Sequence, residues 1–299
     1  MSSSPSSKPS YDTSSADSVP KGATYWYDGQ PVVSDTITIP IDDPGLLRGV
    51  NLFTTLRVHH TLDHPATQWP AHCDRLRTTI ETFNFTPPNW DHIRAGAEYI
   101  HQHYPVVRIL VFPNGIEWIT GRLIPSDLDR KHTEGITAWL APPEYQRAMP
   151  QYKSTSYLAS WIGDREGRAR NAEATILTNP DGHWLETTTG SLWGYRDGQW
   201  WVPPQFTETK DGRPLAQRLS STTQNFIIQL LEKEGQTVGL RPWTPDWVPQ
   251  LEAITYGSTI TGAVPIRRVL DSDGRSCWQN PEPGPADELL KLWKRAIAP

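Results

Sequence analysis

Residues 175–203 read TILTNPDGHWLETTTGSLWGYRDGQWWVP, and this stretch decides the fold of the C-terminal half. Its β-branched and aromatic runs are separated by two Asp-Gly pairs, at 181–182 and 197–198. Asp-Gly pairs accept the positive φ angles that tight hairpin turns require. The stretch therefore predicts an antiparallel meander, and the amphipathic pattern of residues 222–235 predicts a helix after it.

Short strands and helices also alternate in the N-terminal half. The segment ATYWYDGQPVV at 23–33 carries the same Asp-Gly signal and predicts a hairpin. The segment TITIPI at 36–41 alternates strictly, as a strand does. The remaining predicted elements are a strand at 51–60, helices at 68–83 and 89–104, strands at 106–112, 136–142 and 251–257, and a helix at 286–296.

This mixture of hairpins and clustered helices predicts an α+β protein of two α/β domains, not a regular βαβ winding. The Pro-containing segment PPEYQRAMP marks the boundary, so the predicted domains are residues 23–143 and 144–299. Residues 1–22 are Ser-rich and lack periodic apolar positions, which predicts a disordered tail. A transit peptide is the alternative, but two aspartates and the absence of arginine argue against it.

Composition excludes several classes of protein. The 299 residues contain 28 Lys and Arg against 33 Asp and Glu, for a net charge of −5, without the basic excess that a nucleic-acid partner requires. Two cysteines, Cys73 and Cys277, cannot build a disulfide framework, so we expect a cytoplasmic location. No uncharged apolar run approaches the ~18–20 residues that span a bilayer, so we expect a soluble protein without a membrane partner.

The common fingerprints of nucleotide-binding proteins, zinc proteases and serine hydrolases are absent from the sequence. Histidines lie close together at 59–60 and at 101 and 103, but no carboxylate or cysteine accompanies them. Such histidines are more often surface groups than metal ligands. We therefore predict no metal site.

Lysine usage singles out one residue. Seven of the eight lysines lie in the tail, in polar loops or on helices. Lys153 instead lies in QYKSTSYLASWI, among aromatic, hydroxyl and aliphatic residues without an adjacent charge. Partial desolvation of this kind lowers the pKa of an amine toward the neutral nucleophile. The alternative is a lysine at the end of a strand that reaches water.

Five motifs occur in a particular order along the chain: FTTLRV at 53–58, HCDRL at 72–76, KSTSYL at 153–158, DGHWLETTTGSLW at 181–193, and GST at 257–259 ahead of VPI at 264–266. In this order they resemble the fold-type IV pyridoxal-phosphate enzymes, the class IV aminotransferase superfamily. That family carries a lysine that forms a Schiff base with the cofactor, and later a motif of "DG", a spacer and "E-x-x-x-x-N-L-F". The resemblance covers residues 25–292.

The resemblance implies a cofactor, pyridoxal 5′-phosphate, held between the two domains. Lys153 would form the Schiff base, and Glu186 would face the pyridine nitrogen and keep the ring an acceptor of electrons. The cofactor phosphate would be bound by Arg75, Thr222, Thr223 and Thr259. A surface arginine, helix caps and a turn residue are the plainer alternatives for these four. Ser221 and Ser191 stand where relatives have Gly and Asn.

The motif at residues 53–58 also indicates which reaction is catalysed. The segment FTTLRV at 53–58 resembles the "F-T-T-x-R-V" of many 4-amino-4-deoxychorismate lyases more than the "F-E-G-I-R" of branched-chain transaminases. This implies a pyridoxal-phosphate-dependent lyase that releases pyruvate and yields 4-aminobenzoate for folate synthesis. Arg108, and more weakly Arg122, would bind the two carboxylates of this substrate. However, residues 112–115 read FPNG, where many lyases have a Gly- and Arg-rich loop.

Two alternatives stay open from the sequence. One is a branched-chain or D-amino-acid transaminase that uses the same Lys153 and Glu186. The other is a cofactor-binding or scaffold protein that kept the fold without turnover, which the departures at Ser191 and Ser221 motivate. Relatives of this family are homodimers, so the resemblance also implies a homodimer.

Overall fold

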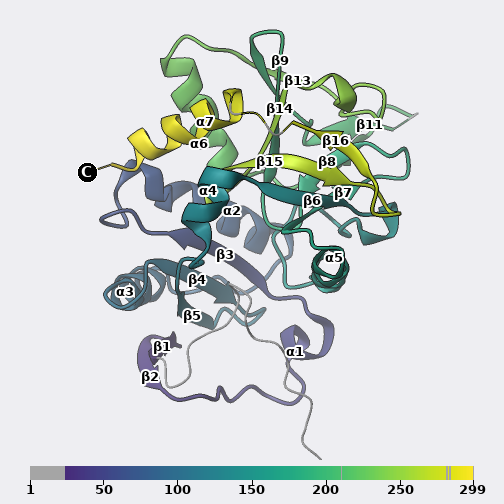
Figure 1. Cartoon of the computed structure of the whole chain (residues 1–299). Helices are drawn as coiled ribbons and strands as arrows, with labels where there is room; N and C mark the ends of the chain where they lie inside the picture. The colour runs from purple at the N-terminus through teal and green to yellow at the C-terminus, as the bar shows by residue number, and fades with distance from the viewer. Residues whose placement is uncertain (1–23, 210, 281, 283, 299) are drawn as a thin grey trace, which may run out of the picture.

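The chain is described here by a computed structural model that covers residues 24–209, 211–280, 282 and 284–298. Figure 1 shows two bodies, each built on its own sheet, with helices against both sheets. The α+β class with two sheet-containing domains is thus confirmed. The tail predicted at residues 1–22 lies outside the described residues.

The N-terminal body contains a five-stranded antiparallel sheet in the order β2-β1-β5-β4-β3. Asp28 and Gly29, between β1 and β2, have φ angles of 48° and 77°, as the predicted hairpin requires. The strands are β1 (Thr24–Tyr27), β2 (Gln30–Val33), β3 (Leu52–Arg57), β4 (Val106–Val111) and β5 (Glu117–Arg122).

The strand predicted at residues 36–41 is absent, so that prediction is wrong. Side chains from β1 take the place of a strand partner there: Tyr25 Oη donates to the carbonyl of Thr36 at 2.7 Å. Ile41, the last apolar residue of the alternating pattern, is 89% exposed. Residues 36–41 pair with no strand, so this alternating pattern remains an irregular segment.

The two helices predicted in this half are present, and they cover one face of the small sheet. They are α2 (Trp69–Thr82) and α3 (Trp90–His101), and Asn89 caps α3 by accepting from the amides of Asp91 and His92. Alternate residues of the strands, including Leu56 and Ile109, are buried beneath these helices. Their neighbours along each strand point to the opposite face. Two shorter elements complete this body, α1 (Pro44–Arg48) and η1 (Pro65–Thr67).

The C-terminal body contains a nine-stranded sheet whose path closes on itself. Strand β8 pairs with both β7 and β9, so six strands form a closed barrel in the order β9-β14-β15-β6-β7-β8. The barrel strands are β6 (Ile136–Leu140), β7 (Ala174–Thr178), β8 (Trp184–Thr187), β9 (Ser191–Arg196), β14 (Ala253–Ser258) and β15 (Gly262–Leu270). The sheet extends beyond them through β10 (Gln199–Val202), β13 (Val238–Leu240) and β16 (Ser276–Gln279).

Strand β6 lies parallel to both of its neighbours, β15 and β7. It precedes the predicted domain boundary at residues 143 and 144 yet belongs to the larger sheet. The division into domains at that point stays a prediction.

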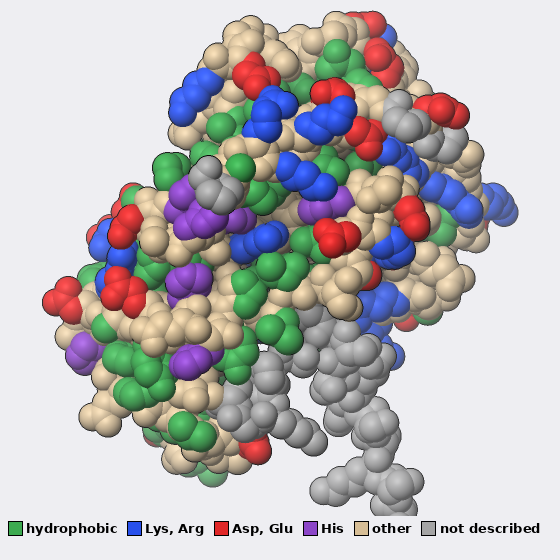
Figure 2. All heavy atoms as spheres, turned by 60° about the vertical axis from the view of Figure 1, so that its left-hand side comes forward, with side chains coloured by type: hydrophobic (Ala, Val, Ile, Leu, Met, Phe, Trp, Pro, Cys, Tyr) green, Lys and Arg blue, Asp and Glu red, His purple; other side chains and the backbone are tan. Residues whose placement is uncertain are grey.

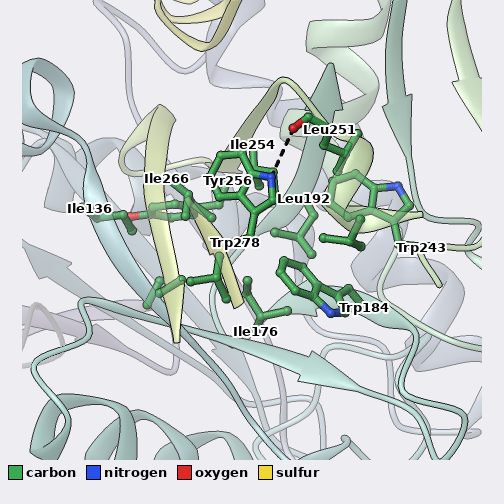
Figure 3. Close-up of a cluster of buried hydrophobic side chains, with 14 of the residues drawn as sticks. Ile136, Ile176, Trp184, Leu192, Trp243, Leu251, Ile254, Tyr256, Ile266 and Trp278 are labelled. Carbon is green, nitrogen blue, oxygen red and sulfur yellow. Dashed lines mark hydrogen bonds between the residues drawn. The ribbon is translucent and has the colours of Figure 1, made fainter. Parts of the chain in front are cut away.

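Alternate residues of the barrel strands fill its interior. Figure 3 shows this cluster, in which branched aliphatic side chains pack around several indoles. Trp278 Nε1 donates to the carbonyl of Leu251 at 3.2 Å, so its polar atom is satisfied within the core. Nine of the 14 tryptophans are buried, four of them in this cluster and the other five in the separate clusters beneath the helices and the small sheet.

Helices cover the outside of the barrel. The helices predicted at 222–235 and 286–296 are confirmed as α6 (Thr222–Lys233) and α7 (Pro285–Ala296), which share a buried cluster with the sheet. The remaining elements are α4 (Leu128–Glu134), α5 (Leu158–Ala169), the short helices η2 (Pro143–Tyr145) and η3 (Val248–Gln250), and the hairpin of β11 (Phe206–Glu208) and β12 (Pro214–Ala216).

Acidic and basic side chains are interspersed on the face that Figure 2 shows, in keeping with the small net charge. Among the helices in the described ranges, none combines the length and the apolar character that crossing a membrane would require.

Candidate active site

A cavity of about 720 Å³ lies between the two bodies and is lined by both. Every site residue predicted from the sequence lines it. These residues are Arg75, Arg108, Arg122, Lys153, Glu186, Thr222, Thr223 and Thr259. Five separate sequence motifs thus meet in one place, while the roles of the individual residues stay predictions.

Lys153 lies on a segment that crosses from one body to the other. Its carbonyl accepts from the Phe53 amide at 3.0 Å, and the Thr155 amide donates to Asn51 at 2.8 Å, so the segment runs along the end of β3. The lysine Nζ lies 4.8 Å from the centre of the Phe53 ring. Lys153 is thus among the residues that line the cavity.

The surroundings of Lys153 favour the neutral amine. Its side chain is half-buried because it faces the cavity, and the protein around it removes most of the water. Burial lowers the pKa of Lys153 well below its ordinary value, and three nearby arginines lower it further. These surroundings therefore favour the neutral amine, the form that acts as a nucleophile or a base.

Glu186 lies in β8, where its pairing with Ser191 in β9 closes the barrel. Arg147 Nη2 and Nε both donate to Glu186 Oε1, at 2.9 and 3.1 Å, and the Leu219 amide donates to Oε2 at 3.3 Å. Burial opposes the charge on Arg147, but Glu186 raises the pKa of that guanidinium above its usual value. The carboxylate is therefore held rigidly at the cavity wall.

Sequence reasoning missed Arg147. It lies in the segment PPEYQRAMP, whose prolines indicate a boundary, and a lone arginine in such a segment carries no signal of a site. Only the folded chain brings it to Glu186, 39 positions away.

Tyr157 was also missed, although it lies within the motif KSTSYL. Its ring meets the Phe53 ring edge-on, with centroids 5.6 Å apart, and its hydroxyl donates to the carbonyl of Thr188 at 3.2 Å. Burial raises the pKa of Tyr157, so the phenol stays protonated at neutral pH. Its place in the motif KSTSYL was the signal that could have identified it.

One end of the cavity carries the guanidinium of Arg75, and we call it the anion end because a fixed cation favours an anion. Arg75 donates from Nη1 to the carbonyl of Ser220 at 3.1 Å and from Nη2 to Thr54 Oγ1 at 2.9 Å. Burial lowers the pKa of Arg75 to about 10, so it remains charged at neutral pH. The plainer alternative, a surface arginine, is thus wrong.

Helix α6 begins at the same end of the cavity. Ser221 is its N-cap, accepting from the Gln224 amide at 3.1 Å, so Thr222 and Thr223 are the first two helical residues and not caps. The amides of a first helical turn have no partner inside the helix and favour an anion. Both threonines therefore offer a hydroxyl and an amide to the cavity.

Thr259 lies in the loop between β14 and β15. Its Oγ1 accepts from the Arg57 amide at 3.4 Å, and Arg57 Nη1 donates to the carbonyl of Ile260 at 3.2 Å. Strand β3 of the N-terminal body thus holds this loop of the C-terminal body. With its oxygen accepting from Arg57, the Thr259 hydroxyl has its hydrogen left to donate.

The opposite wall is one face of the small sheet. Residues paired across antiparallel strands point to the same side, so Arg108, paired with Thr55 and Thr120, shares that side with both. The guanidinium of Arg108 lies 3.9 Å from the centre of the Phe53 ring. The face is made of Phe53, Thr55, Arg108, Leu110, Trp118, Thr120 and Arg122.

The sequence model of the class IV amino-transferase family matches residues 51–269. The chain belongs to the class IV aminotransferase family. The family expected from the sequence is therefore confirmed, and with it an enzyme class that depends on pyridoxal 5′-phosphate. A search of the curated proteins finds no significant match.

Solved structures show the same fold. A hypothetical aminotransferase from Mycobacterium tuberculosis, with α-ketoglutarate and PMP bound, is 20% identical, with a TM-score of 0.76 over 92% of this chain and 99% of that one. The Escherichia coli branched-chain amino acid aminotransferase is 17% identical, with a TM-score of 0.73 over 91% and 93%. A branched-chain aminotransferase from Thermoproteus uzoniensis, with norvaline, is 18% identical, with a TM-score of 0.74 over 92% and 94%.

The side chains that line the cavity fit the cofactor of this family. Lys153, an amine with a lowered pKa, lines the same cavity as Arg75 at the anion end and the fixed carboxylate of Glu186. A phosphorylated pyridine aldehyde requires these three groups: a neutral amine, a cationic phosphate site and an acid for the ring nitrogen.

Proposed function

We propose that this member of the class IV aminotransferases is a 4-amino-4-deoxychorismate lyase, which converts its substrate into 4-aminobenzoate and pyruvate. The observation that supports this reaction is the face of the small sheet that looks into the cavity. It presents two arginines, Arg108 and Arg122, among the apolar rings of Phe53 and Trp118. The substrate has one carboxylate on its ring and a second on its enolpyruvyl group, so it is complementary to such a face.

The register of β4 and β5 supports binding of two carboxylates by the two arginines. Arg108 pairs with Thr120 and Arg122 pairs with Val106, so the arginines are diagonal neighbours on adjacent strands. Diagonal neighbours lie about 7–8 Å apart at their Cα atoms, within reach of two carboxylates on one small molecule. A branched-chain amino acid has one carboxylate and an apolar side chain, and leaves the second arginine without a substrate group.

Each residue of the site has a role in this reaction. Arg75, Thr222, Thr223 and Thr259 would hold the phosphate of pyridoxal 5′-phosphate, and Glu186 would face its ring nitrogen. When bound, the cofactor supplies an acceptor for the electron pair that is left when the substrate loses a proton. Lys153 lies near the face that binds substrate, since Arg108 is close enough to lower the pKa of its amine.

Lys153 Nζ takes the proton from the amine-bearing ring carbon. The bond between the ring and the enolpyruvyl oxygen then breaks, and the ring becomes aromatic. Lys153 returns the proton to the methylene carbon of the released enolpyruvate, which gives pyruvate. The atoms balance without an oxidant or a second substrate, so no oxo acid is consumed. We further propose a homodimer, as the resemblance of the sequence to this family implies, and a cytoplasmic location, as the low number of cysteines indicates.

The test supplies enzymatically generated 4-amino-4-deoxychorismate and pyridoxal 5′-phosphate, without any oxo acid, and measures both products. We expect equal amounts of 4-aminobenzoate and pyruvate, and none from Lys153→Ala. If turnover appears only when an amino donor and an oxo acid are supplied together, the protein is a transaminase of branched-chain or D-amino acids. A protein whose absorbance does not change with the cofactor would contradict the cofactor site itself.

Arg108→Gln separates substrate binding from cofactor binding. Removing one charged hydrogen-bond donor should raise the KM for the substrate by about 10–100-fold. The affinity for pyridoxal 5′-phosphate should stay unchanged, because Arg108 lies on the sheet face and not at the anion end. Equal losses of both affinities would mean that Arg108 acts on the fold of the cavity and not on the substrate.

A further inference from the structure

A chain of four polar side chains crosses between the two bodies behind the anion end of the cavity. Arg75 Nη2 donates to Thr54 Oγ1 at 2.9 Å, and Thr54 Oγ1 lies 2.7 Å from His72 Nδ1. On the other side of the imidazole, His72 Nε2 lies 3.2 Å from Thr222 Oγ1. Arg75, Thr54 and His72 belong to the N-terminal body, and Thr222 opens helix α6 of the other.

The donors and acceptors along this chain follow from the arginine. A guanidinium can only donate, so Thr54 Oγ1 accepts from Arg75 and has its own hydrogen left to give. His72 Nδ1, 2.7 Å away, is the acceptor for that hydrogen. Arg75 Nη2 also lies 3.5 Å from Nδ1, where a second N–H would be repelled.

The imidazole then has one tautomer available. His72 is 1% exposed, and burial together with the charges of Arg75 and Lys153 lowers its pKa well below the ordinary value, so the ring is neutral. A neutral ring that accepts at Nδ1 carries its hydrogen on Nε2. Nε2–H therefore donates to Thr222 Oγ1.

This tautomer of His72 determines how the Thr222 hydroxyl can bond. Once its oxygen accepts from His72, its hydroxyl hydrogen is free to donate, and Thr222 lines the cavity beside Arg75. An anion bound there is the acceptor that such a hydroxyl requires.

We propose that His72 is a positioning residue that holds the Thr222 hydroxyl as a hydrogen-bond donor to the phosphate of the cofactor. This inference rests on the cofactor site under the proposed function. His72 does not touch the phosphate in this arrangement. It acts through Thr222, and it couples the phosphate site to β3 of the other body through Thr54.

Two titrations of the full-length protein without cofactor test the inference. The first uses pyridoxal 5′-phosphate and the second uses pyridoxal, which has the same aldehyde but no phosphate. The variants are His72→Leu, Thr222→Val, the double variant and His72→Gln, whose amide can still donate. His59→Leu is the matched control, because His59 is also a buried histidine but does not line the cavity.

We expect His72→Leu and Thr222→Val each to weaken binding of the phosphorylated compound about tenfold and to leave pyridoxal binding unchanged. The double variant should be no weaker than either single variant, since both remove the same donor. His72→Gln should recover part of the loss, and His59→Leu should bind normally. Multiplicative losses in the double variant, or equal losses for both compounds, would overturn the inference.

The tautomer of His72 can be measured by NMR in the absence of the cofactor. Nitrogen chemical shifts of the His72 ring in the unliganded protein should report hydrogen on Nε2, and a ring with hydrogen on Nδ1 would overturn the inference. If the unchanged protein binds pyridoxal but gains nothing from the phosphate, the proposed anion end is wrong, whatever the tautomer. If it prefers the phosphorylated compound and His72→Leu keeps that preference in full, only the role of His72 is wrong.

Discussion

Arg147 donates twice to a single oxygen of Glu186, from Nη2 at 2.9 Å and from Nε at 3.1 Å, and the two side chains are only 6% and 9% exposed. Arg147 Nη2 also donates to the carbonyl of Pro150 at 2.6 Å, which fixes the guanidinium to the segment that leads to Lys153. The pair therefore joins two parts of the site that are far apart in sequence, the lysine segment and the barrel closure.

Arg147→Met should destabilise the protein strongly. It leaves the Glu186 carboxylate buried without its ion-pair partner, which typically costs about 3–5 kcal/mol in the free energy of unfolding. Urea unfolding of the protein without cofactor measures this loss. Arg147→Met combined with Glu186→Gln should recover part of it, because no charge is then left unpaired. A loss below about 1 kcal/mol in the single variant would contradict a structural role for the pair.

Lys153→Met should stabilise the protein without cofactor at neutral pH. Because the folded-state pKa of Lys153 lies well below the unfolded value of about 10.4, the unfolded chain binds more protons between those two values. The stability of the unchanged protein therefore rises with pH across this window, while the variant has no such gain. We expect an advantage for the variant of about 1–3 kcal/mol at pH 7 that shrinks as pH approaches 10.4.

Unfolding experiments at several pH values with both proteins check the sign. An advantage of Lys153→Met that grows with pH would show that the folded state favours the charged amine, contrary to the surroundings of Lys153.

His59 should make folding sensitive to acid. Burial, and then the charge of Arg57, lower the pKa of His59 to about 4, against about 6.5 when unfolded. Below pH 6.5 the unfolded chain takes up the proton first, so stability falls as pH drops from 6.5 to 4, by up to about 3 kcal/mol from this residue. In His59→Gln the slope should become shallower but should persist, since His72 and His132 have lowered pKa values as well. An unchanged slope would contradict this prediction.

Gly190→Ala should damage the turn between β8 and β9, next to the Glu186–Ser191 pair. A Cβ at Gly190 would lie 2.4 Å from the carbonyl oxygen of Gly257, an impossible contact with backbone of β14. We expect a loss of about 1–3 kcal/mol in thermal unfolding. Gly163→Ala is the control: its added Cβ would lie 3.4 Å or more from Tyr145 and Thr175, and alanine is favoured over glycine within helix α5, so stability should not fall. Equal losses in the two variants would mean that the close approach to β14 is not the cause.

Local elements were largely predictable because their signals are local. Turn residues and alternation predicted the hairpin at Asp28 and Gly29 and the meander of the barrel, and apolar spacing predicted α2, α3, α6 and α7. Helix α5 was not predicted, because it contains Gly163 and Gly167, and glycine disfavours a helix. Close packing of α5 against β7 requires a glycine at position 167, since a Cβ there would lie 2.6 Å from Thr175 Oγ1.

The amino-acid sequence alone determined the family and the residues that meet in the cavity, because the order of motifs survives even where identity is low. Tertiary structure decided how those residues act. Arg147 meets Glu186, and His72 meets Thr222 across 150 positions, only when the barrel closes and the two bodies pack together. Hydrogen-bond partners of this kind depend on side-chain directions set by packing, and no local pattern in a sequence encodes them.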